Sequence, residues 1–158
     1  DAINIISTDA KLVSKIKNRK DVLLTPHPGE MARLCKTSSD AIQSKRLRML
    51  EDFCKDKKFS LLLKGYRSLL YADKNNILVN STGGPALAKG GSGDVLSGMI
   101  ASFVAQGLKP YEAGALGMFV HGACADTLLE EKGVSELSVL PTDVISKLGD
   151  VISWLIES

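Results

Sequence analysis

The sequence has little net charge, no long apolar run and no recognisable leader, and each of these absences excludes a class of protein. The formal charge is only +2, with Lys and Arg interleaved among Asp and Glu, so we expect no broad cationic face for nucleic acid or an anionic membrane. No apolar run approaches the roughly 20 residues of a membrane helix, and the first residues lack a signal-peptide pattern. We therefore expect a soluble protein with neither nucleic acid nor membrane as a partner.

Cysteine is also scarce. Cys35, Cys54 and Cys124 are odd in number, far apart in the chain and free of CxxC or Cys/His metal spacing. This usage fits a reducing compartment better than a disulfide scaffold. The sequence therefore predicts core or surface thiols and a cytoplasmic protein, and we name no metal ligands.

The length allows one compact domain. A chain of 158 residues with 44% apolar content can bury a real core but is too short for two ordinary domains, so we expect a single domain over residues 1–158. Residue 1 is Asp rather than Met, and an amphipathic pattern begins almost at once (Ile3, Ile6, Ala10, Val13, Ile16). We expect this chain to continue an N-terminal segment of a longer protein.

Hydrophobic periodicity predicts helices alternating with short strands. The expected helices cover about residues 2–16, 28–35, 38–57, 94–105, 110–131 and 141–156, and the expected strands cover 22–24, 60–64, 68–72 and 77–79, with a hairpin turn at 73–76. This order indicates an α/β layered domain with antiparallel strands toward one edge.

The segment TPHPGE forms a polar corner between a strand and a helix. Pro26 and Pro28 end the apolar run at 22–24, while Pro28 suits a first helical position and Glu30 a first helical turn. The corner is therefore expected where a strand passes into a helix, with His27 beside it.

The most informative stretch runs from Asn80 to Asp94, NSTGGPALAKGGSGD, and is followed by VLSGMI to Ile100. Glycines at 90, 91 and 93 let a ligand approach the backbone, and the following helix presents free N–H groups, which is typical of an anion site. The spacing matches neither a Walker loop nor a dinucleotide fingerprint, and a plain glycine-rich turn is the alternative. Asp94 can cap the helix or act as a base beside a phosphate.

This stretch, with KGYRS and TPHPGE upstream and HGACAD downstream, resembles the C-terminal half of the ADP/ATP-dependent NAD(P)H-hydrate dehydratases of the ribokinase-like fold. The resemblance implies a three-layer α/β domain, mostly parallel with an antiparallel hairpin at one edge, of which this chain holds the C-terminal half to two-thirds. Asp1–Asn4 is similar to the end of a DADALN segment that normally lies well inside the domain.

The resemblance also implies a reaction. NADHX or NADPHX, the hydrated coenzymes, would be phosphorylated at the C6 hydroxyl and would lose phosphate, which restores NAD(P)H. The expected cosubstrate is ADP or ATP with Mg²⁺, with ADP favoured, and the expected assembly is a homo-oligomer. The alternatives are a small-molecule kinase of the same fold, of hydroxyethylthiazole or hydroxymethylpyrimidine type, and a nucleotide-binding module without catalysis.

Site residues follow from the same motifs. Asp94 would be the base on the substrate hydroxyl, and His27 a substrate contact. The expected nucleotide contacts are Lys64, Gly65, Tyr66, Arg67, Ser68, Gly91 and Gly93. Taken alone, Lys64 is compatible with a solvated lysine and His27 with a surface histidine.

Other residues are assigned differently. Glu30 would hold the corner or a metal-bound water, and His121, among small helical residues, would serve packing. Two positions depart from the family pattern: Gly84 stands where Asn is common, and Lys89 stands where Thr is common. Side-chain contacts from those positions cannot be carried over, and Lys89 could instead meet a phosphate.

Overall fold

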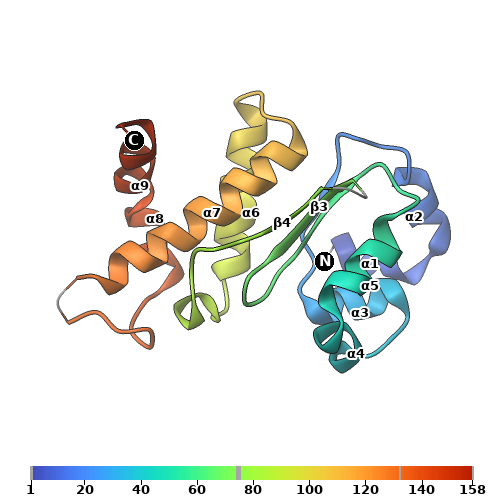
Figure 1. Cartoon of the computed structure of the whole chain (residues 1–158), viewed down its shortest axis with the longest axis horizontal. Coiled ribbons are helices and arrows are strands. Elements are labelled where there is room, and N and C mark those ends of the chain that lie inside the picture. Colours follow the sequence, from blue (N-terminus) through green and yellow to red (C-terminus); the bar gives the residue numbers. More distant parts are fainter. Residues whose placement is uncertain (1, 74–75, 132, 158) are drawn as a thin grey trace. The chain divides into compact units, whose positions relative to one another are not determined.

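The computed structural model describes residues 2–73, 76–131 and 133–157. Within it the chain divides into two compact units, one formed by Asp1–Val79 and Lys109–Tyr111 and the other by Asn80–Leu108 and Glu112–Ser158. The first unit carries the sheet and the second is helical (Figure 1).

The sheet has the order β1-β2-β3-β4, made of β1 (Leu23–Leu24), β2 (Ser60–Leu63), β3 (Leu69–Asp73) and β4 (Asn76–Val79). β1 pairs with β2 in parallel, whereas β2–β3 and β3–β4 are antiparallel. The antiparallel hairpin at one edge is thus confirmed, and within this chain the parallel part of the sheet is the β1–β2 pair. The tip of the predicted turn, at 74–75, lies outside the described residues.

The described residues of the first unit also form the helices α1 (Ala2–Thr8), α2 (Ala10–Ile16), α3 (Pro28–Cys35), α4 (Ser39–Ser44) and α5 (Arg46–Cys54). The predicted helix 2–16 is broken at Asp9, whose carboxylate accepts from Lys11 N and caps α2. The predicted helix 38–57 is broken at Lys45, whose non-helical backbone (φ −141°, ψ 42°) separates α4 from α5. Both expectations of one continuous helix were wrong.

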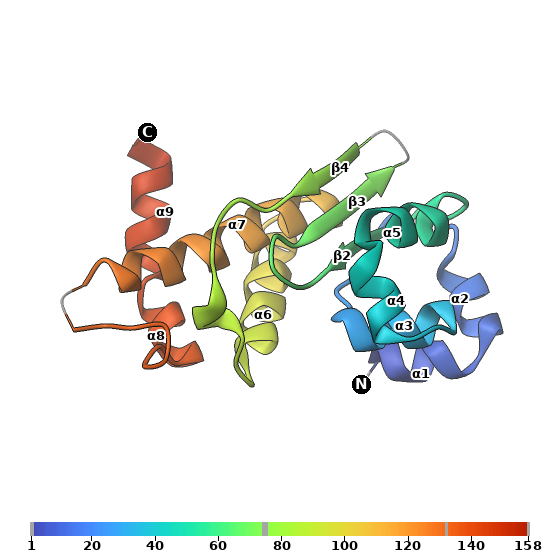
Figure 2. The same ribbon diagram turned by 60° about the horizontal axis from the view of Figure 1, so that its bottom comes forward.

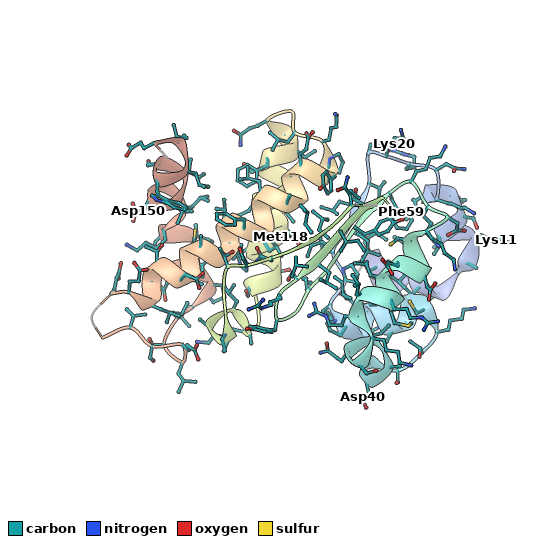
Figure 3. The ribbon with its side chains drawn as sticks, in the orientation of Figure 1. Lys11, Lys20, Asp40, Phe59, Met118 and Asp150 are labelled. Carbon is teal, nitrogen blue, oxygen red and sulfur yellow. The ribbon has the colours of Figure 1, made fainter. Side chains whose placement is uncertain are left out.

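The core of the first unit lies between the sheet and these helices. α5 contacts β2 and β3 (Figure 2). Met31, Ile42, Leu50, Phe59 and Leu61 have no exposed surface. Figure 3 shows Phe59 among the crowded side chains beside the sheet. The short amphipathic helices are stabilised mainly by this burial rather than by their own length.

The second unit contains a short 3₁₀ turn, η1 (Pro85–Leu87), and the helices α6 (Ser92–Ala105), α8 (Pro141–Ser146) and α9 (Leu148–Glu157). It also contains the helix α7 (Pro110–Leu129) from Glu112 onward. α6 and α7 approach closely, since a Cβ at Gly117 would lie 2.5 Å from Ile100 Cγ1. The predicted helix 141–156 is divided between α8 and α9, which was not expected.

The cysteines are free thiols, as predicted. Cys54 and Cys124 are buried and Cys35 is half-buried. Burial raises the pKa of Cys54 to about 12 and that of Cys124 to about 11, so both are protonated at neutral pH. Across the described ranges, no helix has the length and apolar character needed to cross a membrane.

Candidate functional site: a glycine-rich helix N-terminus and a strand-end corner

The glycine loop of the second unit leads directly into α6. Gly91 is the N-cap residue, with a left-handed φ of 88° that disfavours any side chain, and no side chain caps this helix. Asp94 N and Val95 N both donate to Gly91 O, at 3.0 and 3.1 Å. Among the hydrogen bonds of the described residues, the Gly91 and Gly93 amides have no acceptor. Free amides at an exposed helix N-terminus suit an anion.

Asp94 lies in the first turn of α6, as predicted. Its side chain is exposed, and it accepts no hydrogen bond from any residue in the described part of the chain. Because no neighbouring donor occupies the carboxylate, it is free to accept a proton from a hydroxyl placed beside the loop.

Helix α7 holds the segment that precedes the glycine loop. Asn80 Nδ2 donates to Met118 O at 3.0 Å, and Thr82 Oγ1 donates to Phe119 O at 2.8 Å. The two elements are in such close contact that a Cβ at Gly122 would lie 2.3 Å from Thr82 Oγ1. The small residues of α7 therefore bring this segment onto the helix.

A second contact from α7 fixes the same segment further along. Asp126 Oδ2 accepts a hydrogen bond from Gly83 N at 2.8 Å, and Gly83 has a φ of 77°. Sequence reasoning missed Asn80, Thr82 and Asp126. Position was the available signal: Asn80 and Thr82 lie just before the glycines, and Asp126 is the last residue of the HGACAD motif.

His121 of α7 reaches the glycine loop from inside the unit. Its Nε2 lies 3.4 Å from Ser92 Oγ, and both residues are 6% exposed. Burial lowers the pKa of His121 to about 4, so the imidazole is neutral at physiological pH. From the sequence His121 was assigned to packing, and this polar contact with Ser92, the first residue of α6, was not foreseen.

The Lys89 ammonium is bound by the protein itself. Its Nζ donates to Leu137 O at 2.7 Å and to Val139 O at 2.5 Å. The sequence left open a phosphate contact for Lys89, whereas here the side chain points to backbone carbonyls about fifty residues further along.

The polar corner in the first unit is a reciprocal helix cap. His27 Nδ1 accepts hydrogen bonds from Gly29 N and Glu30 N at 3.1 and 3.3 Å, and Glu30 Oε2 accepts one from His27 N at 2.7 Å. Two acceptor bonds at Nδ1 require the ring proton on Nε2. This reciprocal cap explains why His27 and Glu30 occur at the corner. Glu30 holds the corner, which was one of the two roles expected for it.

The parallel strands bring a second predicted residue to the corner. Lys64 follows β2 and donates its backbone N–H to Pro26 O at 2.9 Å, so the KGYRS loop and the TPHPGE corner lie at the same end of neighbouring strands. Lys64 Nζ is 4.0 Å from Glu30 Oε2. His27 is half-exposed, so its ring can still contact a ligand.

The KGYRS loop is shaped by a residue that the motif does not contain. Arg46 at the start of α5 donates to Tyr66 O and, at 3.4 Å, to Leu63 O. Ser68 Oγ donates to Gly65 O at 3.1 Å, within the loop, while Tyr66 and Arg67 are exposed. Arg46 lies about twenty residues away in sequence, so no motif pointed to it.

The arrangement can bind anions but shows no metal site. Within the described ranges, no three His, Cys, Asp or Glu side chains gather as ligands for a metal ion. In the second unit the amides at Gly91 and Gly93 suit phosphate oxygens, and in the first unit the ammonium of Lys64 does.

Comparison with known proteins identifies the relatives. Residues 1–149 match the family model described as NAD(P)H-hydrate dehydratase. The bifunctional NAD(P)H-hydrate repair enzyme Nnr of Moorella thermoacetica is 41% identical over 99% of this chain and 29% of its own length. The ADP-dependent (S)-NAD(P)H-hydrate dehydratase of Neisseria meningitidis is 39% identical over 85% of this chain and 46% of its own length.

Solved structures agree with the predicted fold. The Bacillus subtilis ADP/ATP-dependent NAD(P)H-hydrate dehydratase, co-crystallized with ATP/Mg²⁺, aligns with a TM-score of 0.77 and 32% identity over 84% of this chain and 47% of that one. A ribokinase-like superfamily protein from Enterococcus faecalis aligns with a TM-score of 0.71 and 26% identity over 96% and 50%. The ribokinase-like α/β fold is confirmed, and the chain spans about half of these structures.

Proposed function

Because this chain belongs to the NAD(P)H-hydrate dehydratase family, we propose that the protein containing it restores NADHX and NADPHX to NADH and NADPH at the expense of a nucleotide. The match favours this activity over the thiazole or pyrimidine kinase and over a non-catalytic module. The observation that carries the proposal is the exposed Asp94 carboxylate at the amide-rich N-terminus of α6.

Asp94 acts as the general base in this proposal. The C6 hydroxyl oxygen attacks the terminal phosphorus of the nucleotide while its proton passes to the Asp94 carboxylate, which general-base catalysis accelerates by ~10²–10⁴-fold. Phosphate is then a far better leaving group than hydroxide, and the ring nitrogen supplies the electron pair that expels it. Loss of the C5 proton restores the ring double bond.

The glycine loop fits the transferring phosphoryl group. No side chain caps this helix, and the Gly91 and Gly93 amides donate to no acceptor among the described residues. Amides fixed by the turn can stabilise the negative charge that develops there without reorganising. Mg²⁺, when bound with the nucleotide, supplies charge neutralisation of the phosphates.

The first unit has its own proposed roles. We propose that His27 contacts the hydrated nicotinamide through its ring and that Lys64, with Gly65–Ser68, binds nucleotide phosphate. These roles are supported by the half-exposed imidazole and by the shared strand end of the two motifs. Preference for ADP over ATP, a cytoplasmic location, a homo-oligomeric assembly and a single domain over residues 1–158 stay predictions.

An absorbance assay tests the proposal. NADHX lacks the dihydronicotinamide absorbance, so the full-length protein with Mg²⁺ and ADP or ATP should restore it, with phosphate released in equal amount. The two nucleotides are compared at equal concentration. Phosphorylation of a thiazole or pyrimidine alcohol without recovery of NADH would instead establish the kinase, and no turnover with any of these would leave only binding.

A further inference from the structure

The segment Ser135–Pro141, which we call the strap, runs alongside the glycine-rich segment 84–91 of the same unit. Glu136 Oε1 lies 4.0 Å from the position of a Cβ at Gly84, and Pro141 Cγ lies 3.4 Å from that of a Cβ at Gly91. Between these ends, Lys89 Nζ donates to Leu137 O and Val139 O. The strap therefore meets the glycine-rich segment at its start, its middle and its end.

These contacts coincide with the two departures from the family pattern. Gly84 leaves room beside the Glu136 carboxylate where an asparagine side chain would stand, and Lys89 provides a cation that threonine lacks. A lysine bound to two carbonyls forms charge-assisted hydrogen bonds, which are about twice as strong as neutral ones. In this chain the strap is thus held by a bond that a threonine at position 89 could not make.

Lys89 is also part of the start of the phosphate site. Its carbonyl accepts a hydrogen bond from Ser92 N at 3.2 Å, the first amide of α6. Fixing the side chain at the strap consequently fixes the peptide that positions this amide. Pro141, at the far end of the strap, packs against Gly91 itself.

The strap is ordered around its anchor. Ser138 Oγ donates to Ser135 O, and Val139 N donates to Ser135 O at 3.3 Å, which closes a turn. Val139 is 2% exposed, whereas Leu137 is 91% exposed and contributes little packing of its own. At the C-terminal end of the strap, Leu140 N donates to Asp143 Oδ2 of α8 at 2.8 Å. The Lys89 bonds and the buried Val139 hold the middle of the segment.

We propose that Lys89 is a positioning residue, which ties the strap Ser135–Pro141 to the glycine loop and thereby sets the geometry of the Gly91 and Gly93 amides for phosphate. The inference rests on the proposed nucleotide binding at that loop. Lys89 acts through the strap and not by touching phosphate.

Hydrogen exchange on the ligand-free, full-length protein tests whether Lys89 holds the strap in place. Lys89→Met should speed exchange at Ser138, Val139 and Asp94 by about tenfold, the size expected for coupling through a packed segment. Lys89→Arg, which can still donate to both carbonyls, should exchange like the wild type. Lys147→Met is the charge-matched control, because Lys147 instead pairs with Glu131 and Asp150.

Nucleotide affinity tests the consequence. The Kd for ADP with Mg²⁺ should rise about tenfold in Lys89→Met and stay within about twofold in Lys89→Arg and Lys147→Met. If Lys89→Met leaves hydrogen exchange at the strap unchanged, Lys89 does not hold the strap. If exchange becomes faster but the Kd is unchanged, Lys89 has no positioning role. A wild type that binds no nucleotide would refute the proposed function instead, while the exchange data still decide whether Lys89 holds the strap.

Discussion

Acid should destabilise the second unit through His121. The imidazole is buried, and burial lowers its pKa to about 4 from an ordinary value of 6.5. Unfolding exposes the ring and returns the pKa to that ordinary value. Between these two pKa values the imidazole is protonated in the unfolded chain but not in the folded chain. The stability contributed by the neutral ring is therefore lost as the pH falls.

The size of the effect follows from the two pKa values. The contribution is complete above the unfolded pKa of 6.5 and fully lost below the folded value of about 4. At about 1.4 kcal/mol per pKa unit, the whole difference is worth about 3 kcal/mol, and about 2 kcal/mol of it is lost by about pH 5. That is a large part of the stability of a small domain.

Urea unfolding at about pH 7.5 and about pH 5 measures this loss. Trp154 is the one tryptophan in the sequence and lies in α9, so its fluorescence reports on the second unit. His121→Gln keeps a polar side chain that does not titrate, so the wild type should lose about 2 kcal/mol more than this variant between the two pH values. Equal losses in the two proteins would show that His121 is not held neutral in the fold.

Three further substitutions test other contacts. Gly122→Ala should lower the free energy of unfolding in urea by ~2 kcal/mol or more, because its Cβ would lie 2.3 Å from Thr82 Oγ1. Gly98→Ala is the control, since a Cβ there faces open space and should be neutral or stabilising. Equal losses of stability in the two variants would contradict the close contact at Gly122. His27→Asn should keep stability within ~0.5 kcal/mol, since Asn also caps helices, yet lower kcat/KM for NADHX; retained kcat/KM would reduce His27 to a cap. Lys64→Met should raise the nucleotide Kd more at low than at high salt, and an unchanged Kd at low salt would exclude a phosphate contact.

The sequence predicted best where the signal is local. Pro26 and Pro28 end a strand and start a helix by their own covalent geometry, and His27 and Glu30 complete the cap within four residues. The breaks at Asp9 and Lys45 were missed, because the apolar period continues across both. Only a local cap at Asp9 and a non-helical backbone at Lys45 interrupt the helices. The hydrophobic pattern fixes which face is buried but not whether a helix is continuous.

The site was predictable only in part. Gly91 and Asp94 were found because a left-handed glycine and a first-turn carboxylate leave a pattern within a few residues. The bonds of Lys89 and Arg46 to distant carbonyls were not found, since a lysine or arginine bound to backbone looks the same in sequence as a solvated one. Every residue carries a backbone carbonyl, so the residues that accept these hydrogen bonds also leave no signal in the sequence.

The turnover of Asp94→Asn tests most directly whether Asp94 is the base of a nucleotide-dependent dehydration. Asn keeps the size of the side chain and can still sit in the first helical turn, so the melting temperature and the Kd for ADP or ATP should stay close to wild type. It cannot take a proton at neutral pH, so kcat for NADHX should fall by ~10²–10⁴-fold. A folded, nucleotide-binding Asp94→Asn protein that kept more than about a tenth of the wild-type kcat would contradict this role and leave Asp94 as a helix cap.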